Sequence, residues 1–315
     1  MPLDPIAEKI VQMFGDAGVG ITPESTPESA RAAMHRLATS GALPKREVHA
    51  VEDFAIPGPA SEIPVRVFRP NAQESLPALV WFHGGGWVVG SIETEDQLCR
   101  MLCDDARAIV LSVEYRLAPE TKFPGAVDDC VAAWSWVTAH ASELGIDPGR
   151  IAVGGDSAGG NLAAVTALVA KHESLAMPAF QLLVYPVTDH EFERPSMVDN
   201  ATGYFLEADG MRWFFDHYAR TTDDHADWRM SPLRAPDLAG LPATIVITAE
   251  YDPLRDQGEA YGERLRDAGV PTEIVRADGL FHGFFGLFAF MPAARPSWDR
   301  AIAGLRQAFT ASAFS

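Results

Sequence analysis

The sequence predicts an α/β protein built on a mostly parallel sheet with helices covering both faces. Short apolar runs rich in β-branched residues alternate with longer stretches of helical periodicity, which is typical of parallel strands joined by crossover helices. Two of the runs, at 79–82 and 151–154, lead directly into glycine-rich loops. The chain has 315 residues, enough for one large domain or two smaller ones.

Eight segments carry the pattern of strands. The first two alternate between apolar and polar residues and are separated by Pro57-Gly58-Pro59, so we expect an antiparallel pair. The other six are short apolar runs of the kind that parallel sheets bury. In chain order the predicted strands are 46–56, 62–69, 79–82, 109–113, 151–155, 182–186, 245–249 and 272–276.

Helical periodicity predicts two helices before the first strand. One covers 6–14, and the other begins at a capping-box pair, Ser25 and Glu28, and ends near Gly41. Because these helices need an apolar surface elsewhere, they form either a lid over an active site or a layer on the flank of the domain. The remaining predicted helices are 126–140, 158–171, 257–268 and 296–311.

The interval 187–240 interrupts the alternation of strands and helices. It is rich in aromatic residues and too long for an ordinary connection. We interpret it as an insertion that forms a helical cap together with the N-terminal helices. The predicted organisation is an α/β domain at 46–186 and 241–315, with 1–45 and 187–240 as the two parts of the cap.

Composition narrows the classes of partner. The formal net charge of -18 argues against nucleic acids and anionic membranes as partners.

The cysteines and the N-terminus carry no sign of a disulfide framework, a metal site or a targeting signal. Cys99, Cys103 and Cys130 are too few for a disulfide framework, and no nearby residues complete a set of metal ligands, so we expect buried thiols and no metal. The N-terminus lacks the pattern of a signal peptide, and no run reaches the roughly 18 apolar residues of a membrane span, so we expect a cytoplasmic protein.

The segment from Ile151 to Leu162 carries the pattern on which a catalytic interpretation depends. An apolar run leads into Gly-x-Ser-x-Gly around Ser157, and an alanine-rich helical pattern follows. This is the context of a nucleophile elbow, in which the flanking glycines allow a tight turn that lifts the serine hydroxyl clear of the sheet. A loop of small residues is the alternative interpretation. The adjacent Asp156 is expected to orient nearby loops.

A nucleophilic Ser157 needs a base and an orienting acid. Loops at the carboxyl ends of parallel strands converge, and His282 follows the last predicted strand in such a glycine-rich loop. Asp252 follows the preceding strand and would hold the His282 ring, with Glu250 and Asp256 as rival carboxylates. The order serine, aspartate, histidine matches that of α/β hydrolases.

An oxyanion hole requires backbone N–H groups that no side chain obstructs. Gly84, Gly85 and Gly86, after the 79–82 strand, and Ala158, after the serine, are predicted to supply them. A flexible loop or a phosphate cradle is the alternative, but neither a Walker A nor a dinucleotide pattern follows. His83 is predicted to hold this loop in shape through its ring N–H rather than to act as the base.

Five motifs together resemble the hormone-sensitive lipase family of bacterial carboxylesterases, which has the α/β-hydrolase fold. The Asp-Ser-Ala-Gly form of the elbow resembles the larger subgroup of that family, and the resemblance covers nearly the whole chain. One departure is Thr121-Lys122, where a histidine and an apolar or proline residue are expected. The motifs are His83-Gly84-Gly85-Gly86-Trp87, Tyr115-Arg116-Leu117-Ala118-Pro119-Glu120, Gly155-Asp156-Ser157-Ala158-Gly159-Gly160, Asp252-Pro253-Leu254 and His282-Gly283-Phe284.

The resemblance implies a serine carboxylesterase that hydrolyses short- to medium-chain acyl esters through an acyl-enzyme and needs no cofactor. It implies that two copies pair through the last edge strand. A ligand-binding homologue without turnover and an amidase on the same triad are the alternatives, although related plant hormone receptors lack the histidine present here. The residues to which it assigns roles are the triad Ser157, Asp252 and His282 and the oxyanion donors Gly85, Gly86 and Ala158, with Gly84 beside them.

Apolar residues of the cap and of nearby loops are candidates for the walls of the acyl and alcohol pockets, with packing inside the cap as the alternative. A small capped pocket would exclude long triglyceride chains, which favours an esterase over a lipase. Since the general base must be neutral, activity is expected to fall below roughly pH 6.5, the pKa of free histidine. The pocket candidates are Trp87, Phe205, Trp213, Phe214, Phe215 and Leu254.

Overall fold

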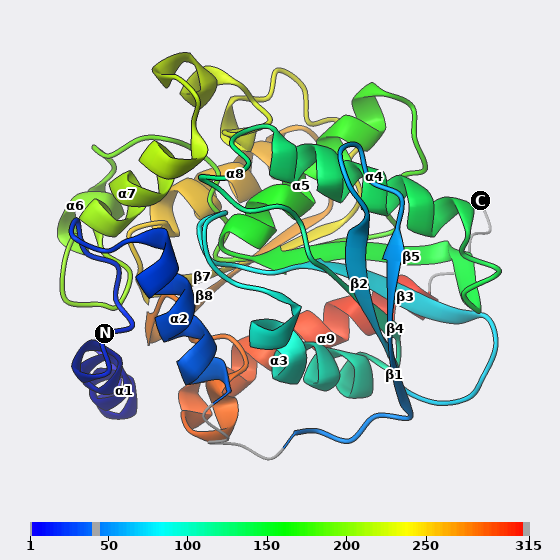
Figure 1. The fold of residues 1–315 in the computed structure, drawn as a ribbon, viewed down its shortest axis with the longest axis horizontal. Coiled ribbons are helices and arrows are strands. Elements are labelled where there is room, and N and C mark those ends of the chain that lie inside the picture. Colours follow the sequence, from blue (N-terminus) through cyan, green and yellow to red (C-terminus); the bar gives the residue numbers. More distant parts are fainter. Residues whose placement is uncertain (1, 40–44, 311–315) are drawn as a thin grey trace.

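An eight-stranded sheet forms the centre of the computed structural model, which describes residues 2–39 and 45–310 (Figure 1). The spatial order is β1-β2-β4-β3-β5-β6-β7-β8; β2 runs antiparallel to β1 and β4, and all other neighbours are parallel. The predicted fold class is therefore confirmed. The strands are β1 (Ala50–Ile56), β2 (Ile63–Arg69), β3 (Leu76–Phe82), β4 (Ile109–Val113), β5 (Ile146–Asp156), β6 (Gln181–Val184), β7 (Thr244–Tyr251) and β8 (Thr272–Phe281).

Helices cover both faces of the sheet. In Figure 1, α4, α5 and α8 lie on one face and α3 and α9 on the other. The α-helices are α1 (Pro5–Asp16), α2 (Pro27–Ala38), α3 (Ile92–Ala106), α4 (Gly125–Ala139), α5 (Ala158–His172), α6 (Pro195–Asp199), α7 (Ala208–Tyr218), α8 (Arg255–Asp267) and α9 (Arg295–Thr310). The 3₁₀ turns are η1 (Thr222–Ala226), η2 (Pro232–Arg234), η3 (Leu287–Ala289) and η4 (Pro292–Ala294). No helix in the described ranges is long and apolar enough to cross a bilayer.

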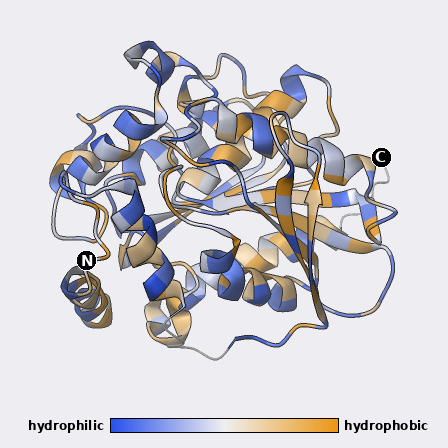
Figure 2. Cartoon of the chain, in the orientation of Figure 1, coloured by the Kyte–Doolittle hydropathy of each residue, from blue (hydrophilic) through white to orange (hydrophobic). Residues whose placement is uncertain are grey.

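Burial explains why the apolar runs form the inner strands. Every residue of β3 and β4 is buried, and α5 is buried from Ala158 to Ala170 between the sheet and its neighbouring helices. The outer helices are amphipathic, with apolar and polar residues on opposite sides (Figure 2). β5 lies in the interior of the sheet, between β3 and β6. The loop that follows β5 is therefore attached to a strand and a helix that are both buried.

Several predicted boundaries differ from the structure; for example, β1 begins at Ala50 rather than at 46, and β5 begins at Ile146 rather than at 151. The capping box of α2 is formed by Thr26 and Ser29, so the predicted pair, Ser25 and Glu28, was wrong by one residue. The last strand extends to Phe281 because pairing with β7 resumes beyond an irregularity near Gly279, where the sequence suggests a turn. The predicted ends at Gly41 and Ala311 lie outside the described residues.

The N-terminal helices lie beside the segment that follows β6 (Figure 1). The Nε1–H of Trp213 in α7 donates to the carbonyl oxygen of Ser25, at 2.9 Å. The ring of Phe14 in α1 lies 5.1 Å from that of Phe205, between ring centroids. Two segments that are distant in the sequence therefore contact each other directly, next to the carboxyl ends of the strands.

Candidate active site

Ser157 occupies the sharp turn between β5 and α5. Its φ angle is 55°, a left-handed conformation that side chains other than glycine rarely adopt. Its N–H donates to the carbonyl oxygen of Val184, at 2.9 Å, which ties the turn to the neighbouring strand. A Cβ on Gly155 would overlap the backbone of Gly159, and a Cβ on Gly159 would overlap that of Phe82. The glycines on both sides are therefore a steric requirement of the turn.

The structure brings Ser157, Asp252 and His282 together in one buried chain of hydrogen bonds. The Nε2 of His282 lies 3.0 Å from the Oγ of Ser157, and its Nδ1 lies 2.7 Å from the Oδ2 of Asp252. With the proton on Nδ1, the carboxylate accepts and Nε2 is free to take a proton from the serine. This is the geometry that a serine nucleophile with a histidine base requires.

The carboxylate of Asp252 is fixed by its own turn, since its Oδ1 accepts from the N–H of Leu254 at 2.8 Å. The rival carboxylates lie elsewhere. Glu250 accepts from the N–H of Gly279, at 2.6 Å. Asp256 accepts from the N–H of Ser196, at 2.8 Å, and is ion-paired with its neighbour Arg255. Among these three acids, Asp252 alone has a hydrogen bond to His282.

The glycine loop after β3 contacts neighbouring atoms so closely at Gly85 and Gly86 that neither position has room for a side chain. Gly85 and Gly86 have φ angles of 111° and 57°. A Cβ on Gly85 would overlap the backbone of Val89, and one on Gly86 would overlap the ring of Phe214 in α7. Ala158, the first residue of α5, lies at a helix N-terminus, where N–H groups have no partner within the helix. The predicted oxyanion donors thus sit on the two segments that flank Ser157.

His83 packs beneath this loop as a neutral residue. Burial lowers its pKa to about 4. The neutral ring then donates from Nδ1 to the carbonyl oxygen of Gly84, at 2.7 Å. Tyr115 stacks on it with centroids 4.2 Å apart and donates from its hydroxyl to the His83 carbonyl oxygen, at 2.8 Å. These contacts fit the predicted structural role, and the ring that reaches the serine is that of His282.

The six pocket candidates separate into two groups. Phe214 lies against Gly86 in the glycine loop, and Phe205 lies against Gly283, next to His282. The side chain of Trp213 packs on Phe214 while its N–H anchors α7 to the N-terminal segment.

The other three candidates are buried in packed surroundings. Trp87 is stacked on Tyr218 with centroids 4.4 Å apart and also contacts Phe215, whose ring packs against His190. Leu254 belongs to the same core cluster.

Two basic residues to which the sequence assigned no contact connect the N-terminal helices and α7 to the α/β domain. Arg31 in α2 donates to the carbonyl oxygens of Val88 and Ala118, both at 2.8 Å, and pairs with Glu120. Lys122 donates to three carbonyl oxygens at the end of α7. Arg31 is separated from its partners by more than 50 residues, so no local pattern could have indicated these contacts.

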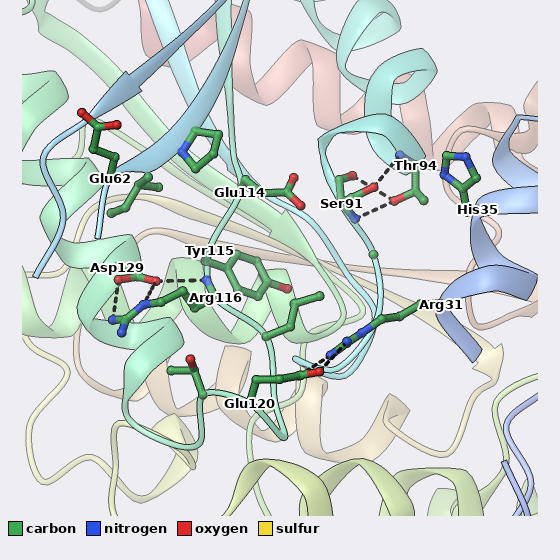
Figure 3. A pocket seen from close by; sticks show the side chains of 15 residues that line it. Arg31, His35, Glu62, Ser91, Thr94, Glu114, Tyr115, Arg116, Glu120 and Asp129 are labelled. Atoms are coloured by element: carbon green, nitrogen blue, oxygen red, sulfur yellow. Dashed lines mark hydrogen bonds and ion pairs between the residues drawn. The ribbon is translucent and has the colours of Figure 1, made fainter. Parts of the chain in front are cut away.

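Arg31 also borders a cavity of about 550 Å³ between α2 and the loop that follows β4 (Figure 3). The cavity wall contains two ion pairs, Arg31 with Glu120 and Arg116 with Asp129. Glu62 and Glu114 also line it, and the Glu114 carboxylate accepts from the N–H of Ile92. The candidate triad does not line it. In the described part of the chain, no group of three or more histidine, cysteine or acidic side chains could hold a metal ion, and the three cysteines are buried thiols.

Comparison with known proteins is consistent across sequence and structure. Residues 79–286 match the family model described as alpha/beta hydrolase fold. The chain is 41% identical over 314 residues to the carboxylic ester hydrolase LipN of Mycobacterium tuberculosis, covering 96% of this chain and 82% of that protein. It is 42% identical over 287 residues to an arylesterase of Saccharolobus solfataricus, covering 91% of this chain and 93% of that protein.

The solved structures that resemble this chain are also ester hydrolases. An ester hydrolase from the metagenome of Lake Arreo superposes with a TM-score of 0.91 at 41% identity, covering 98% of this chain and 99% of that one. A hyperthermophilic esterase from Pyrobaculum calidifontis also gives a TM-score of 0.91, at 40% identity, covering 98% of this chain and 99% of that one. The chain therefore belongs to the hormone-sensitive lipase family of alpha/beta hydrolases, a family of carboxylic ester hydrolases.

Proposed function

We propose that this protein is a serine carboxylesterase in which Ser157 is the nucleophile, His282 the general base and Asp252 the residue that orients the base. The observation that carries the proposal is the continuous hydrogen-bonded chain from Asp252 through His282 to a strained, buried serine. Strain at a functional turn persists only where the surrounding structure enforces it, and here the adjoining glycines and strands do so.

The reaction follows from this arrangement. Ser157 Oγ attacks the ester carbonyl carbon while His282 takes its proton, and Asp252 stabilises the imidazolium that forms. The N–H groups of Gly85, Gly86 and Ala158 hold the negative oxygen of the tetrahedral intermediate. His282 then protonates the leaving alcohol. Water repeats the same two steps on the acyl-enzyme, which releases the carboxylic acid and restores the serine.

The substrate class that fits best is esters of short- to medium-chain acids. Segments 1–45 and 187–240 would form the cap over the site, and the contacts between Trp213 and Ser25 and between Phe14 and Phe205 support one continuous cap. Phe214 lies against Gly86 of the oxyanion loop and Phe205 against Gly283 beside His282, which supports a small acyl pocket. The name of one relative, an ethyl acetate hydrolase of Pseudomonas putida, 40% identical over 249 residues, supports small esters as substrates.

The test is hydrolysis of p-nitrophenyl acetate, butyrate, octanoate and palmitate by the wild type and by Ser157→Ala. We expect the highest kcat/KM at the short and middle chain lengths and a loss of at least about 10⁴-fold in the variant. An unchanged rate in Ser157→Ala would overturn the assignment of the nucleophile. Rapid turnover of palmitate would overturn the small capped pocket while leaving the nucleophile in place.

If the wild type hydrolyses none of the four esters, two other interpretations remain, an amidase and a ligand-binding homologue without turnover. Labelling of Ser157 by an organophosphate would then indicate an active triad with another substrate, and hydrolysis of p-nitroanilides would identify an amidase. No labelling would indicate a ligand-binding homologue.

A further inference from the structure

The glycine loop after β3 has an unusual backbone over three successive residues. Gly85, Gly86 and Trp87 have φ angles of 111°, 57° and 61°. The loop closes on itself, since the N–H groups of Val88 and Val89 donate to the carbonyl oxygen of Gly85, at 3.0 and 2.9 Å. A tryptophan with a positive φ is strained, and such strain persists only where surrounding contacts enforce it. The contacts that hold this loop therefore also fix the proposed oxyanion donors Gly85 and Gly86.

One of these contacts comes from the N-terminal helix α2, through Arg31. Its Nε–H donates to the carbonyl oxygen of Val88 and its Nη2 donates to that of Ala118, both at 2.8 Å. The N–H of Ala118 in turn donates to the carbonyl oxygen of Trp87, at 2.8 Å. A single guanidinium thus holds the end of the glycine loop and the segment that is hydrogen-bonded to it. Among the described residues, no other group donates to either of the two oxygens.

Burial makes these two hydrogen bonds hard to replace. Val88 and Ala118 are completely buried, so a carbonyl oxygen that lost Arg31 would have no access to bulk water unless the loop rearranged. The loop is therefore expected to change its conformation when the guanidinium is removed.

Glu120 orients the guanidinium from the other side of the contact. Nη1 and Nη2 of Arg31 donate to its two carboxylate oxygens, at 2.8 and 2.7 Å (Figure 3). A pair of this kind fixes the plane of the guanidinium. The Glu120 side chain is 63% exposed, so the attraction between the charges contributes little, and orientation is the main effect of the pair.

We propose that Arg31 is a positioning residue for the oxyanion hole, which it holds in shape through the carbonyl oxygens of Val88 and Ala118. This inference rests on the proposed function. Backbone N–H groups stabilise a developing oxyanion most when they are fixed before the reaction. Arg31 acts on the reaction through the glycine loop, and Glu120 acts through Arg31. The geometry of the oxyanion hole then depends on the placement of α2.

The experiment compares the same substitution at two arginines of α2. Arg31→Met removes the donors and retains much of the aliphatic stem, and Arg36→Met, at an exposed position of the same helix, is the matched control. The measurements are kcat and KM for p-nitrophenyl acetate and p-nitrophenyl octanoate. For Arg31→Met we expect kcat to fall about tenfold on both esters and KM to stay within about twofold of wild type, because stabilisation of the transition state is lost. For Arg36→Met we expect wild-type values.

Inhibition by a trifluoromethyl ketone separates the oxyanion hole from other effects of Arg31. The ketone adds to the serine as a hemiketal whose negative oxygen occupies the position of the oxyanion, so it is an analogue of the transition state. We expect its inhibition constant to rise in Arg31→Met by the same factor as kcat/KM falls. A substitution that only loosened α2 would instead change KM and the preference between the two esters.

Two further variants extend the test. Arg31→Lys keeps a donor for one of the two carbonyl oxygens, so we expect a loss in kcat of about threefold with a matching rise in the inhibition constant. This variant replaces Arg31→Met if the latter does not fold, as judged by circular dichroism. Glu120→Ala removes the orienting partner, and we expect a loss in kcat of about threefold in the wild type and none in Arg31→Met.

The proposal is overturned by an unchanged kcat in Arg31→Met, by a loss that Arg36→Met shares, or by a loss confined to KM or to one ester. It is also overturned if kcat falls while the inhibition constant keeps its wild-type value, because the oxyanion hole would then be intact. Equal losses from Glu120→Ala with and without Arg31 would contradict the orienting role of Glu120. Failure of the proposed function is distinguishable, because the wild type itself would then hydrolyse neither ester.

Discussion

The ammonium group of Lys122 lies 2.8 Å from the backbone carbonyl oxygen of His217, at the C-terminal end of α7. It also donates to the carbonyl oxygens of Asp216, at 3.2 Å, and Ala219, at 2.8 Å. The last carbonyl groups of a helix have no partner within it and carry partial negative charge, which a cation stabilises. Position 122, where the sequence departs from the family motif, thus fastens the helix that carries Phe214 to the α/β domain.

We expect Lys122→Met to lower the free energy of unfolding by about 1–2 kcal/mol, because the aliphatic stem is retained and only the charged hydrogen bonds are lost. Urea unfolding of wild type and variant measures this difference. Lys9→Met, on the exposed surface of α1, is the matched control and should change stability by less than about 0.5 kcal/mol. Equal effects of the two substitutions would contradict the anchoring role of Lys122.

Asp252→Asn should lower kcat by roughly 10⁴-fold with little change in fold, because an amide stabilises the wrong tautomer of His282 and cannot balance the imidazolium charge. The control is Glu250→Gln, the same change in the rival acid near the end of β7, whose carboxylate accepts from the N–H of Gly279. Glu250→Gln should keep kcat within a few-fold of wild type. Steady-state kinetics on p-nitrophenyl butyrate decides between the two acids, and the reverse ranking would make Glu250 the orienting residue.

Gly86→Ala should lower kcat at least about tenfold, since the new methyl group overlaps the Phe214 ring and displaces an oxyanion donor. Adding Phe214→Ala removes the obstacle, so the double variant should regain part of the lost rate. Gly85→Ala is the contrasting case: its Cβ would meet the backbone of Val89, and Phe214→Ala should not rescue it. Rescue of both glycine variants, or of neither, would contradict the proposed contact between Phe214 and Gly86.

The sheet and the candidate triad were predictable because their patterns are local. Apolar runs mark the buried strands, and Ser157, Asp252 and His282 each follow one of those strands. Parallel strands deliver their following loops to the same edge, and the structure brings the three side chains within hydrogen-bond distance there. The sequence already favoured Asp252 over its rival Glu250, and in the structure the Glu250 carboxylate accepts from the N–H of Gly279.

What the sequence could not predict depends on contacts between distant segments. The sequence of the 187–240 interval does not show which of its aromatic side chains line a cavity and which pack inside the core. The structure places Phe214 on the glycine loop and buries Phe215, its neighbour, against Trp87. The prediction of the capping box of α2 was wrong for a local reason. Ser25 and Thr26 are both good N-cap residues followed by suitable partners, and the backbone conformation selects Thr26.

The buried His83 predicts how stability depends on pH. Its pKa in the folded protein is about 4, below the usual 6.5, so between these values the unfolded chain binds a proton that the native protein does not. The contribution of His83 is therefore fully present above about pH 6.5 and is lost as the pH falls toward 4, by about 3 kcal/mol in total.

Urea unfolding of wild type and His83→Asn at pH 7 and pH 4.5 tests whether the contribution of His83 to stability is lost as the pH falls. An asparagine amide can still donate to Gly84, but it does not titrate. The variant should be less stable than wild type at pH 7, yet lose about 2 kcal/mol less on acidification. His49→Asn, at an exposed position before β1, is the control and should lose as much as wild type. If His83→Asn and wild type lost equal stability on acidification, the pKa of His83 would be the same in the folded and unfolded protein, which would contradict its lowered pKa.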